Sequence, residues 1–427
     1  MPVLYYTMRQ YSITLTISSL SPKGYGRAHA DGRDFHIWNA LPGETVRAEI
    51  FRRKRGVHIG EASEILEPSE HRIEPVDEAF ISTAPWQIMS AEYEDRIKLE
   101  LLQESAAELG TQFSGITGDG KRYGYRNKME FGLFEDNGRY SLSFFKRGRK
   151  GKVTVTGSSL ASDAINSTAA ELLQRINDAG LPPRTLKTMI VRSNREGSTI
   201  AGIFAKQSVA INTAELSAGI AGTAVYLSDP RSPASVVTDH ISTAGALRLT
   251  ENILGTNLEY GLHSFFQVNT GVFELALQKM QPFLSGGAVT DFYSGTGAIS
   301  IPVNDSISEA VLADISEESI EYASRNISAA GLTAYSAVCS PAEKITELIT
   351  PDRTLILDPP RAGLHQDVIN KILRDGPGLV MYLSCNPDTQ IRDVTQLQER
   401  YRIISAELLN FFPGTPHTES LIVLEQR

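Results

Sequence analysis

The feature that most constrains the fold is a series of short, mostly apolar runs in the last third of the chain. They occupy residues 288–290, 310–313, 354–357 and 378–384, and each is followed at once by polar residues or a turn. Runs of this kind, alternating with helical patterns, are typical of buried strands in a parallel sheet. They predict a doubly wound, Rossmann-like α/β domain, which places its chemistry at the carboxyl ends of its strands.

Two of these strand ends, and the start of a later strand, carry candidate catalytic groups. Cys385 follows the run 378–384, and Asn386-Pro387 then breaks the strand. Asp358-Pro-Pro-Arg361 follows the run 354–357, and its prolines force the chain out of the sheet. A Pro/Gly-rich loop places Glu419 immediately before a closing strand. The alternative interpretation of Cys385, taken singly, is a small core residue, and that of Glu419 is an exposed charge.

A glycine turn follows the run 288–290 and predicts a nucleoside site. Asp291 precedes Tyr293, Gly295, Gly297 and Ala298, and a helix start with Pro302 in its first turn is expected next. Ser300 stands where a dinucleotide-binding turn requires glycine or alanine, which favours another nucleoside ligand. Asp314 ends the next run, 23 residues after Asp291, a position suited to ribose hydroxyls.

Taken together, these motifs resemble the S-adenosylmethionine-dependent RNA uracil-5-methyltransferases, a family of class I methyltransferases with a cysteine nucleophile. The similarity extends more weakly over nearly the whole chain. The motifs that carry it are Ser264-Phe-Phe-Gln267-Val-Asn269, Asp291 to Gly297, Asp358-Pro-Pro-Arg361, Ser384-Cys-Asn-Pro387 and Phe412-Pro-x-Thr-x-His-x-Glu419.

The resemblance implies a role for each candidate residue. Cys385 would add to C6 of uracil, and Glu419 would remove the C5 proton. Gln267 and Asp358 would contact the uracil or the methionine part of S-adenosylmethionine. Tyr293, Gly295, Gly297 and Ala298 would form the cofactor turn, and Asp314 would hold the ribose. From its charge and position, Arg361 is expected to stabilise thiolate or enolate charge, whereas His417 is expected to fix its loop.

Composition and length indicate a soluble protein of several domains. The chain has 427 residues, a net charge of −9 and two cysteines, too few for a disulfide framework. We see no apolar run of membrane-spanning length and no export signal. We therefore expect a cytoplasmic monomer with no membrane partner.

Three domains are predicted. Residues 1–67 alternate like the strands of a small OB-like barrel and resemble the TRAM domain, an RNA-binding barrel. Within it, Arg52 to Arg55 read either as an RNA contact or as a solvated hairpin tip. Residues 68–262 are expected to form a central α/β RNA-binding domain, and residues 263–427 the methyltransferase domain.

The chain departs from many relatives where they bind a four-iron, four-sulfur cluster. Those relatives have three cysteines just before a Trp-Gln pair and a fourth much later. Here residues 81–85 precede Trp86-Gln87 without a cysteine, and residues 157–160 lack the fourth. We therefore predict no iron–sulfur cluster and no other metal.

A basic, aromatic segment is the candidate RNA contact. Residues 121–152 contain ten Lys or Arg against three Asp or Glu. Residues 123–131 are predicted to form a strand, and aromatic residues there serve either to stack bases or to pack the core. The substrate-binding candidates are Tyr125, Arg126, Lys128, Lys146 and Arg147, together with Arg361.

The predicted activity is therefore methylation of C5 of one uridine in structured tRNA or 23S ribosomal RNA, with the base flipped out of its stack. Two alternatives remain at this stage. One is a class I methyltransferase of another substrate, since a fold does not determine a function. The other is a non-catalytic protein that binds or folds RNA. The presence of both Cys385 and Glu419 argues against the first alternative, because methylation of nitrogen or oxygen needs no cysteine adduct.

Overall fold

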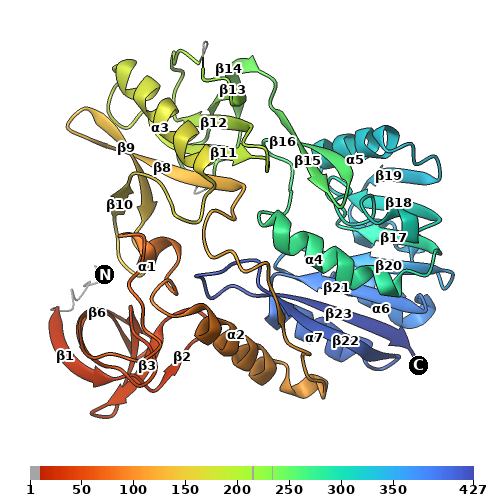
Figure 1. Cartoon of the computed structure of the whole chain (residues 1–427), viewed down its shortest axis with the longest axis horizontal. Helices are drawn as coiled ribbons and strands as arrows, with labels where there is room; N and C mark the ends of the chain where they lie inside the picture. Colours follow the sequence, from red (N-terminus) through yellow and green to blue (C-terminus); the bar gives the residue numbers. More distant parts are fainter. Residues whose placement is uncertain (1–9, 214–215, 233) are drawn as a thin grey trace, which may run out of the picture. The chain divides into compact units, whose positions relative to one another are not determined.

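The computed structural model describes residues 10–213, 216–232 and 234–427 (Figure 1). Its chain divides into two compact units, each built from pieces far apart in sequence. The first unit contains the chain up to Lys98, Leu142–Ser159 and Phe412–His417. The second contains Leu99–Ser141, Leu160–Phe411 and Thr418–Arg427. The three-domain division expected from the sequence stays a prediction.

A six-stranded sheet forms most of the first unit. Its strands pair in the order β1-β5-β6-β4-β3-β2 around one apolar core that includes Phe35, Val46 and Ile50. In β5, buried and exposed residues alternate, as the period-two pattern predicts. The strands are β1 (Tyr11–Thr16), β2 (Ser19–Leu20), β3 (Gly26–Ala30), β4 (Arg33–Trp38), β5 (Thr45–Lys54) and β6 (Val57–Glu67).

The rest of the first unit contains several polar contacts between segments that are far apart in the sequence. It contains α1 (Phe80–Thr83), the first half of α2 (Ala91–Ser105), and a ladder between β10 (Lys152–Val155) and the end of β9 (Arg139–Phe145). Asp77 Oδ2 accepts hydrogen bonds from Ser159 Oγ at 2.8 Å and from Gln87 Nε2 at 3.0 Å. These contacts join the two stretches where relatives of the predicted family carry cluster cysteines.

The second unit contains a sheet of strands ordered β8-β11-β12-β13-β14, with α3 (Asp163–Asp178) packed on β11 and β12. The predicted strand over residues 123–131 was wrong in its start, because β8 begins only at Lys128. Gly124 has a φ of +64°, which ends extended structure there. The strands are β8 (Lys128–Asp136), β11 (Leu186–Ser193), β12 (Thr199–Ala205), β13 (Ile220–Leu227) and β14 (Asp239–Gly245). A separate hairpin pairs β15 (Arg248–Ile253) with β16 (Thr256–Gly261).

The predicted doubly wound sheet is confirmed as an eight-stranded sheet in the second unit. Its order is β19-β18-β17-β20-β21-β23-β22-β7, and the first five strands are parallel. The strands are β7 (Ile116–Thr117), β17 (Ala288–Phe292), β18 (Glu309–Asp314), β19 (Tyr335–Cys339), β20 (Arg353–Leu357), β21 (Leu379–Ser384), β22 (Tyr401–Leu409) and β23 (Glu419–Gln426). The helices are α4 (Thr270–Met280), α5 (Glu317–Ala329), α6 (Gln366–Asp375) and α7 (Pro387–Leu397). Together these elements confirm the predicted α/β fold class.

Short 3-10 helices connect several of these elements. They are η1 (Ala107–Leu109), η2 (Gln281–Phe283), η3 (Asn304–Ser306), η4 (Ala342–Lys344) and η5 (Thr346–Leu348). The helix expected directly after the glycine turn was wrong: residues 295–303 form a run of turns that leads into η3. Gly297 has a φ of +82°, outside the helical region, and Pro302 has no N–H to donate to a helix.

In the described ranges, no helix combines the length and the apolar character needed to cross a membrane.

Candidate active site

The site lies where four parallel strands of the eight-stranded sheet end. Asp314 ends β18, Asp358 follows β20, and Cys385 follows β21. The antiparallel strand β23 begins at Glu419, and its next residue, Ser420, pairs with Ser384. Because β21 ends where β23 begins, Cys385 and Glu419 lie at adjacent strand ends. Four of the groups predicted from the sequence are therefore brought to one edge of the sheet.

Cys385 sits among charged side chains of both signs. Its pKa is raised by burial first and then by the carboxylates of Glu419 and Asp358, while the guanidinium of Arg361 attracts and hydrogen-bonds the thiolate and so lowers the pKa. The raising effects are the larger ones, so the thiol is protonated at neutral pH in the resting protein. Arg361 itself is exposed.

The two carboxyl groups beside the cysteine share one environment. Glu419 is only 2% exposed, so the alternative of an exposed charge is wrong. Burial and the neighbouring Asp358 raise the pKa of Glu419 well above its usual range. Burial, together with the nearby Asp291, raises the pKa of Asp358 to about 7. Gln267 Nε2 donates a hydrogen bond to Asp358 Oδ2 at 3.1 Å, which fixes that carboxyl group.

Two residues hold these strand ends in place: Gln390, which sequence reasoning missed, and Asn386, which it assigned only to the end of the strand. Buried Gln390 lies in α7, and its Nε2 donates to the carbonyls of Tyr382 at 2.8 Å and Ser420 at 3.2 Å, joining β21 to β23. Asn386 Nδ2 donates to the Arg361 carbonyl at 2.7 Å. The only signal in the sequence was their place within six residues of the end of β21.

The glycine turn has the strained backbone that a close ligand approach requires. Tyr293, Gly295 and Gly297 have φ values of 65°, 56° and 82°. Asp314 accepts backbone hydrogen bonds from Gly295 at 3.0 Å and from Ser316 at 2.8 Å, so its carboxylate ties the turn to β18. Ala298 is buried. Tyr293 is partly buried, and burial raises its pKa to about 12, so its hydroxyl stays protonated.

Several buried polar atoms at this turn have no hydrogen-bond partner among the described residues. They are Oδ1 of Asp291, Oγ of Ser294 and Oγ1 of Thr296. Burial raises the pKa of Asp291 to about 7, and its Oδ2 accepts a hydrogen bond from Ser300. Unsatisfied buried groups of this kind point to a polar ligand.

Two exposed apolar side chains flank the turn, and sequence reasoning missed both. Phe265 is 61% exposed and Ile315, directly after Asp314, is 72% exposed. A side chain added at Gly295 would come within 4.0 Å of the Phe265 ring. An apolar residue immediately after a strand-ending aspartate was the signal that could have identified Ile315.

The RNA-contact candidates fall in different units. Tyr125, Arg126 and Lys128 belong to the second unit, and Lys146 and Arg147 to the first. Tyr125 is 6% exposed, which leaves little ring surface for stacking. Lys128 lies near Arg192, and its pKa is lowered to about 8 mainly by burial. These five assignments stay predictions.

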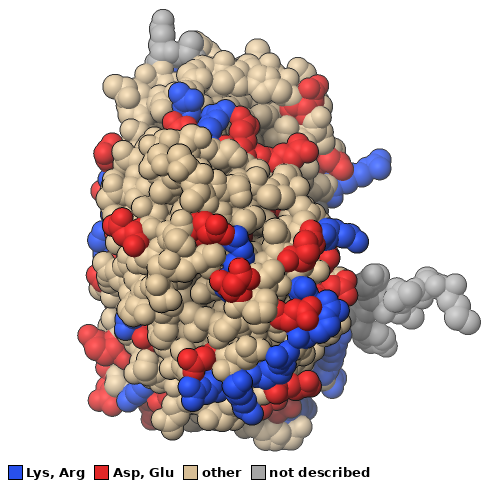
Figure 2. Space-filling view, turned by 90° about the vertical axis from the view of Figure 1, so that its right-hand side faces the viewer, with Lys and Arg blue, Asp and Glu red and all other residues tan. Residues whose placement is uncertain are grey.

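The contacts of Arg147 and the charges on the molecular surface also bear on where RNA binds. Arg147 Nε donates to the Ile81 carbonyl at 2.9 Å, and its guanidinium lies 5.2 Å from the Trp38 ring, so it supports the first unit, whereas Lys146 is exposed. Figure 2 shows Lys and Arg intermixed with Asp and Glu on the face it presents. That face therefore carries no field of a single sign.

Within the described ranges, no group of three or more His, Cys, Asp or Glu is placed to hold a metal ion.

Comparison with known proteins gives a consistent assignment. Residues 250–427 match the family described as tRNA (Uracil-5-)-methyltransferase. An uncharacterized RNA methyltransferase of Lactiplantibacillus plantarum is 26% identical, with 97% of both chains covered. Another, of Caldanaerobacter subterraneus, is 24% identical over 97% of this chain and 98% of that one.

A solved structure shares the fold. It is the Pyrococcus abyssi tRNA (uracil-54, C5)-methyltransferase in complex with S-adenosyl-L-homocysteine, 22% identical to this chain. The TM-score is 0.80, with 96% of this chain and 100% of that chain covered. This match confirms the fold predicted from the sequence. Together with the motifs, the family match over residues 250–427 and the RNA methyltransferase relatives support an RNA uracil methyltransferase.

Proposed function

We propose that the protein transfers a methyl group from S-adenosylmethionine to C5 of one uridine in a structured tRNA or 23S ribosomal RNA, forming 5-methyluridine. The observation that carries the proposal is the pairing of β21 with β23. It places a cysteine and a buried glutamate at adjacent strand ends, beside a third acidic group. Methylation of a nitrogen or oxygen atom would need no such pair, whereas substitution at a pyrimidine carbon needs both.

The residues at the glycine turn fit S-adenosylmethionine. Its amine and hydroxyl groups supply donors and acceptors for the unpartnered buried atoms of Asp291, Ser294 and Thr296. Gly295, Gly297 and Ala298 let the ligand approach the backbone, Tyr293 lies beside them, and Asp314 offers its remaining lone pairs to a ribose. When bound, the cofactor supplies an electrophilic methyl group on a sulfonium. Gln267 and Asp358 orient the uracil or the methionine part.

Cys385 acts as the nucleophile. Its proton passes to the carboxylate of Asp358, whose raised pKa makes it a stronger base than an exposed carboxylate, and Glu419 stays unprotonated for the later step. The thiolate sulfur forms a bond to C6 of the uracil, and the electron pair of the C5–C6 double bond moves into an enolate that makes C5 nucleophilic. Arg361 stabilises the negative charge on the thiolate and on the enolate.

Glu419 completes the reaction. After C5 has gained the methyl group it still carries its original proton. The Glu419 carboxylate removes this proton, the C5–C6 double bond re-forms, and the bond from C6 to the Cys385 sulfur breaks. Because Glu419 is buried, its carboxylate is poorly solvated and its basicity is raised.

The substrate is an unpaired or flipped nucleotide. Sulfur must reach C6 and the methyl donor must reach C5, which a stacked, paired base does not allow. Phosphate contacts come from Arg126, Lys128 and Lys146, and Tyr125 and Arg147 support them from less exposed positions. The first unit, with its six-stranded sheet, adds RNA affinity in the manner of a TRAM domain.

Methyl transfer tests the proposal. The protein is incubated with methyl-labelled S-adenosylmethionine and unmodified tRNA or 23S RNA transcripts, and the RNA is digested to nucleosides. We expect the label in 5-methyluridine from one RNA class. Label only in another nucleoside would contradict the assignment to C5.

Glu419→Gln tests the base. We expect this variant to transfer the methyl group and then retain the RNA, because the C5 proton is no longer removed. Gel electrophoresis under denaturing conditions should show a protein–RNA adduct that persists far longer than in the wild type. The double variant Glu419→Gln, Cys385→Ala is the matched control and should show none. Rapid release by Glu419→Gln would assign the base to another group.

A further inference from the structure

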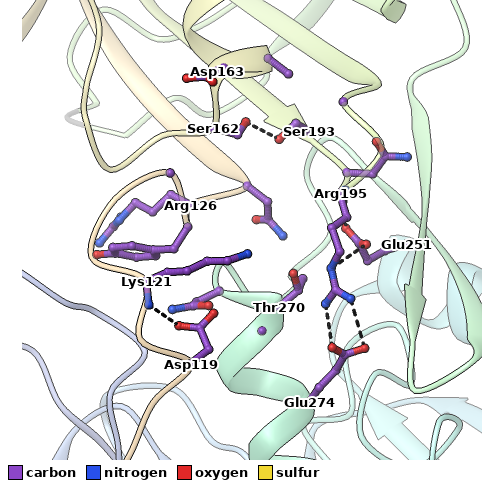
Figure 3. Close-up of a pocket in the computed structure, with 18 of the residues that line it drawn as sticks. Asp119, Lys121, Arg126, Ser162, Asp163, Ser193, Arg195, Glu251, Thr270 and Glu274 are labelled. Atoms are coloured by element: carbon purple, nitrogen blue, oxygen red, sulfur yellow. Dashed lines mark hydrogen bonds and ion pairs between the residues drawn. The ribbon is translucent and has the colours of Figure 1, made fainter.

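A polar cavity of about 770 Å³ opens in the second unit beside the proposed active site (Figure 3). It lies between residues 118–127, the start of α3 and the start of α4. The cavity volume falls within the range typical of small-molecule and nucleotide sites, roughly 300–1,000 Å³. Arg126 and Tyr125, which are proposed above to contact RNA, line it, but the chemical steps of methyl transfer do not use it.

One segment of chain forms a wall of the cavity and also reaches the active site. Asn127 donates from its backbone N–H to the Val268 carbonyl at 3.0 Å and from Nδ2 to the Gln267 carbonyl at 2.9 Å. The side chain of Gln267 is bonded to Asp358 in the active site. Asn269, two residues later, lines the cavity and caps α4. The cavity is therefore a direct neighbour of the site that takes the target uridine.

The cavity contains a buried acceptor that lacks a donor. Asn127 is 7% exposed and lines the cavity, and no described residue donates to its Oδ1. A buried oxygen without a partner costs free energy, so a ligand with an N–H or O–H group is favoured here. The carboxylates that line the cavity have no N–H or O–H group to donate to this oxygen.

Charged groups line opposite sides of the cavity (Figure 3). On one side Arg195 pairs with Glu274 at 3.0 Å and lies beside Glu251, so these charges are mutually compensated. On the other side lie Lys121, which is exposed, and Arg126, together with Asp119, whose Oδ1 accepts the backbone N–H of Lys121 at 3.1 Å. The N-terminus of α3, a helix of 16 residues, also faces the cavity and favours negative charge, part of which Asp163 in its first turn supplies. A ligand with an N–H donor at one end and a phosphate at the other matches this arrangement.

We propose that the cavity holds a second unstacked nucleotide of the RNA substrate, close in the chain to the target uridine. Its base donates an N–H group to Asn127 Oδ1, and its phosphate lies by Lys121 and Arg126. Edge recognition of splayed-out bases is the usual way in which proteins read unpaired RNA. This inference rests on the proposed function, and it makes the cavity a source of substrate selection.

Ala164→Trp tests the proposal by filling the cavity from α3 without removing the bonds of Asn127 to Gln267. Ala164 lines the cavity, whereas Ala170 is exposed on the same helix, so Ala170→Trp is the matched control. Dissociation constants are measured for tRNA and 23S RNA transcripts at one salt concentration. We expect Ala164→Trp to weaken binding of the wild-type substrate roughly tenfold or more and Ala170→Trp to leave it unchanged. If Ala164→Trp lowers the melting temperature strongly, Ala164→Leu replaces it.

RNAs that lack a single base identify which nucleotide occupies the cavity. The missing base is placed in turn at each position of the RNA segment that the wild type protects from nuclease. One position outside the target uridine should weaken binding to the wild type roughly tenfold and have no further effect on Ala164→Trp. Equal binding by both tryptophan variants, or base-removal effects that are the same in wild type and Ala164→Trp, would overturn the proposal. These readouts need no catalysis, so a wild type that binds RNA but transfers no methyl group would contradict only the proposed function.

Discussion

At the residue scale, Cys385 lies between groups that act on its pKa in opposite directions. Burial, Glu419 and Asp358 raise the pKa of the thiol, and Arg361 lowers it. A nucleophile kept protonated in the resting enzyme is protected from adventitious reactions, since the thiolate is the reactive form. Substrate binding must then complete its activation.

Arg361→Ala should change the pH dependence of turnover. Without the guanidinium the thiol pKa rises further, so the acid limb of kcat/KM moves to higher pH. A thiol pKa that is higher by about 1 lowers the rate at neutral pH about tenfold, because the thiolate fraction falls by that factor. Arg361→Lys keeps the positive charge and should move the limb less. A profile with unchanged pH dependence and only a higher KM would show that Arg361 binds RNA without acting on the thiol.

Asp291→Asn should stabilise the protein, and more so at pH 8 than at pH 5. Burial raises the pKa of Asp291 from 3.8 to about 7, so the folded state binds this proton more tightly than the unfolded chain does. The resulting contribution to stability is complete below about pH 4 and is lost as pH rises through about 7. The measurement is the melting temperature of both proteins at the two pH values. Exposed Asp352→Asn is the control and should give no gain at pH 8, and an equal gain from Asp291→Asn at both pH values would contradict the account.

At the element scale, the strands of the eight-stranded sheet were predictable and some of their connections were not. Continuous apolar runs such as 379–384 can be stable only when buried, so β17, β18, β20 and β21 were predicted close to their observed bounds. The helix expected after Gly297 was wrong because a positive φ is a backbone property that the local pattern leaves open. Gln390 was missed because its role depends on two strands that meet only in the fold.

The Asp77 contacts are the element-scale feature with the clearest consequence for stability. Asp77 Oδ1 accepts the Ser159 backbone N–H at 3.0 Å, and its Oδ2 accepts from Ser159 Oγ and Gln87 Nε2. They cross-link segments that many relatives join through cluster cysteines. Hydrogen bonds thus link these segments here.

Asp77→Ala should lower the free energy of unfolding of the first unit by roughly 1–3 kcal/mol, because it leaves partly buried donors unpaired. Asp77→Asn keeps one acceptor and should cost less. Hydrogen exchange of the Ser159 amide provides the local measurement, since exchange should accelerate in Asp77→Ala. Unchanged exchange there would show that other contacts hold the two segments together.

At the scale of the whole molecule, the division into units was beyond sequence reasoning. Residues 142–159 and 412–417 join a unit whose other residues precede 99, and no local pattern marks such long-range associations. The similarity to RNA uracil methyltransferases, the α/β fold class and the residues at the strand ends could be predicted because each depends on a short local motif. Roles that depend on RNA, including those of Lys128 and Lys146, stay predictions because they concern contacts with a second molecule.

The central claim for the molecule is cysteine-dependent substitution at C5 of a uridine. The most direct measurement is release of tritium from tRNA and 23S RNA transcripts labelled at C5 of uridine, with S-adenosylmethionine present, comparing the wild type with Cys385→Ala. We predict release by the wild type from one RNA class and none by Cys385→Ala, which should still bind the cofactor. Equal release by both proteins would contradict the cysteine mechanism, and no release from any RNA by a wild type that binds the cofactor would contradict methylation at C5.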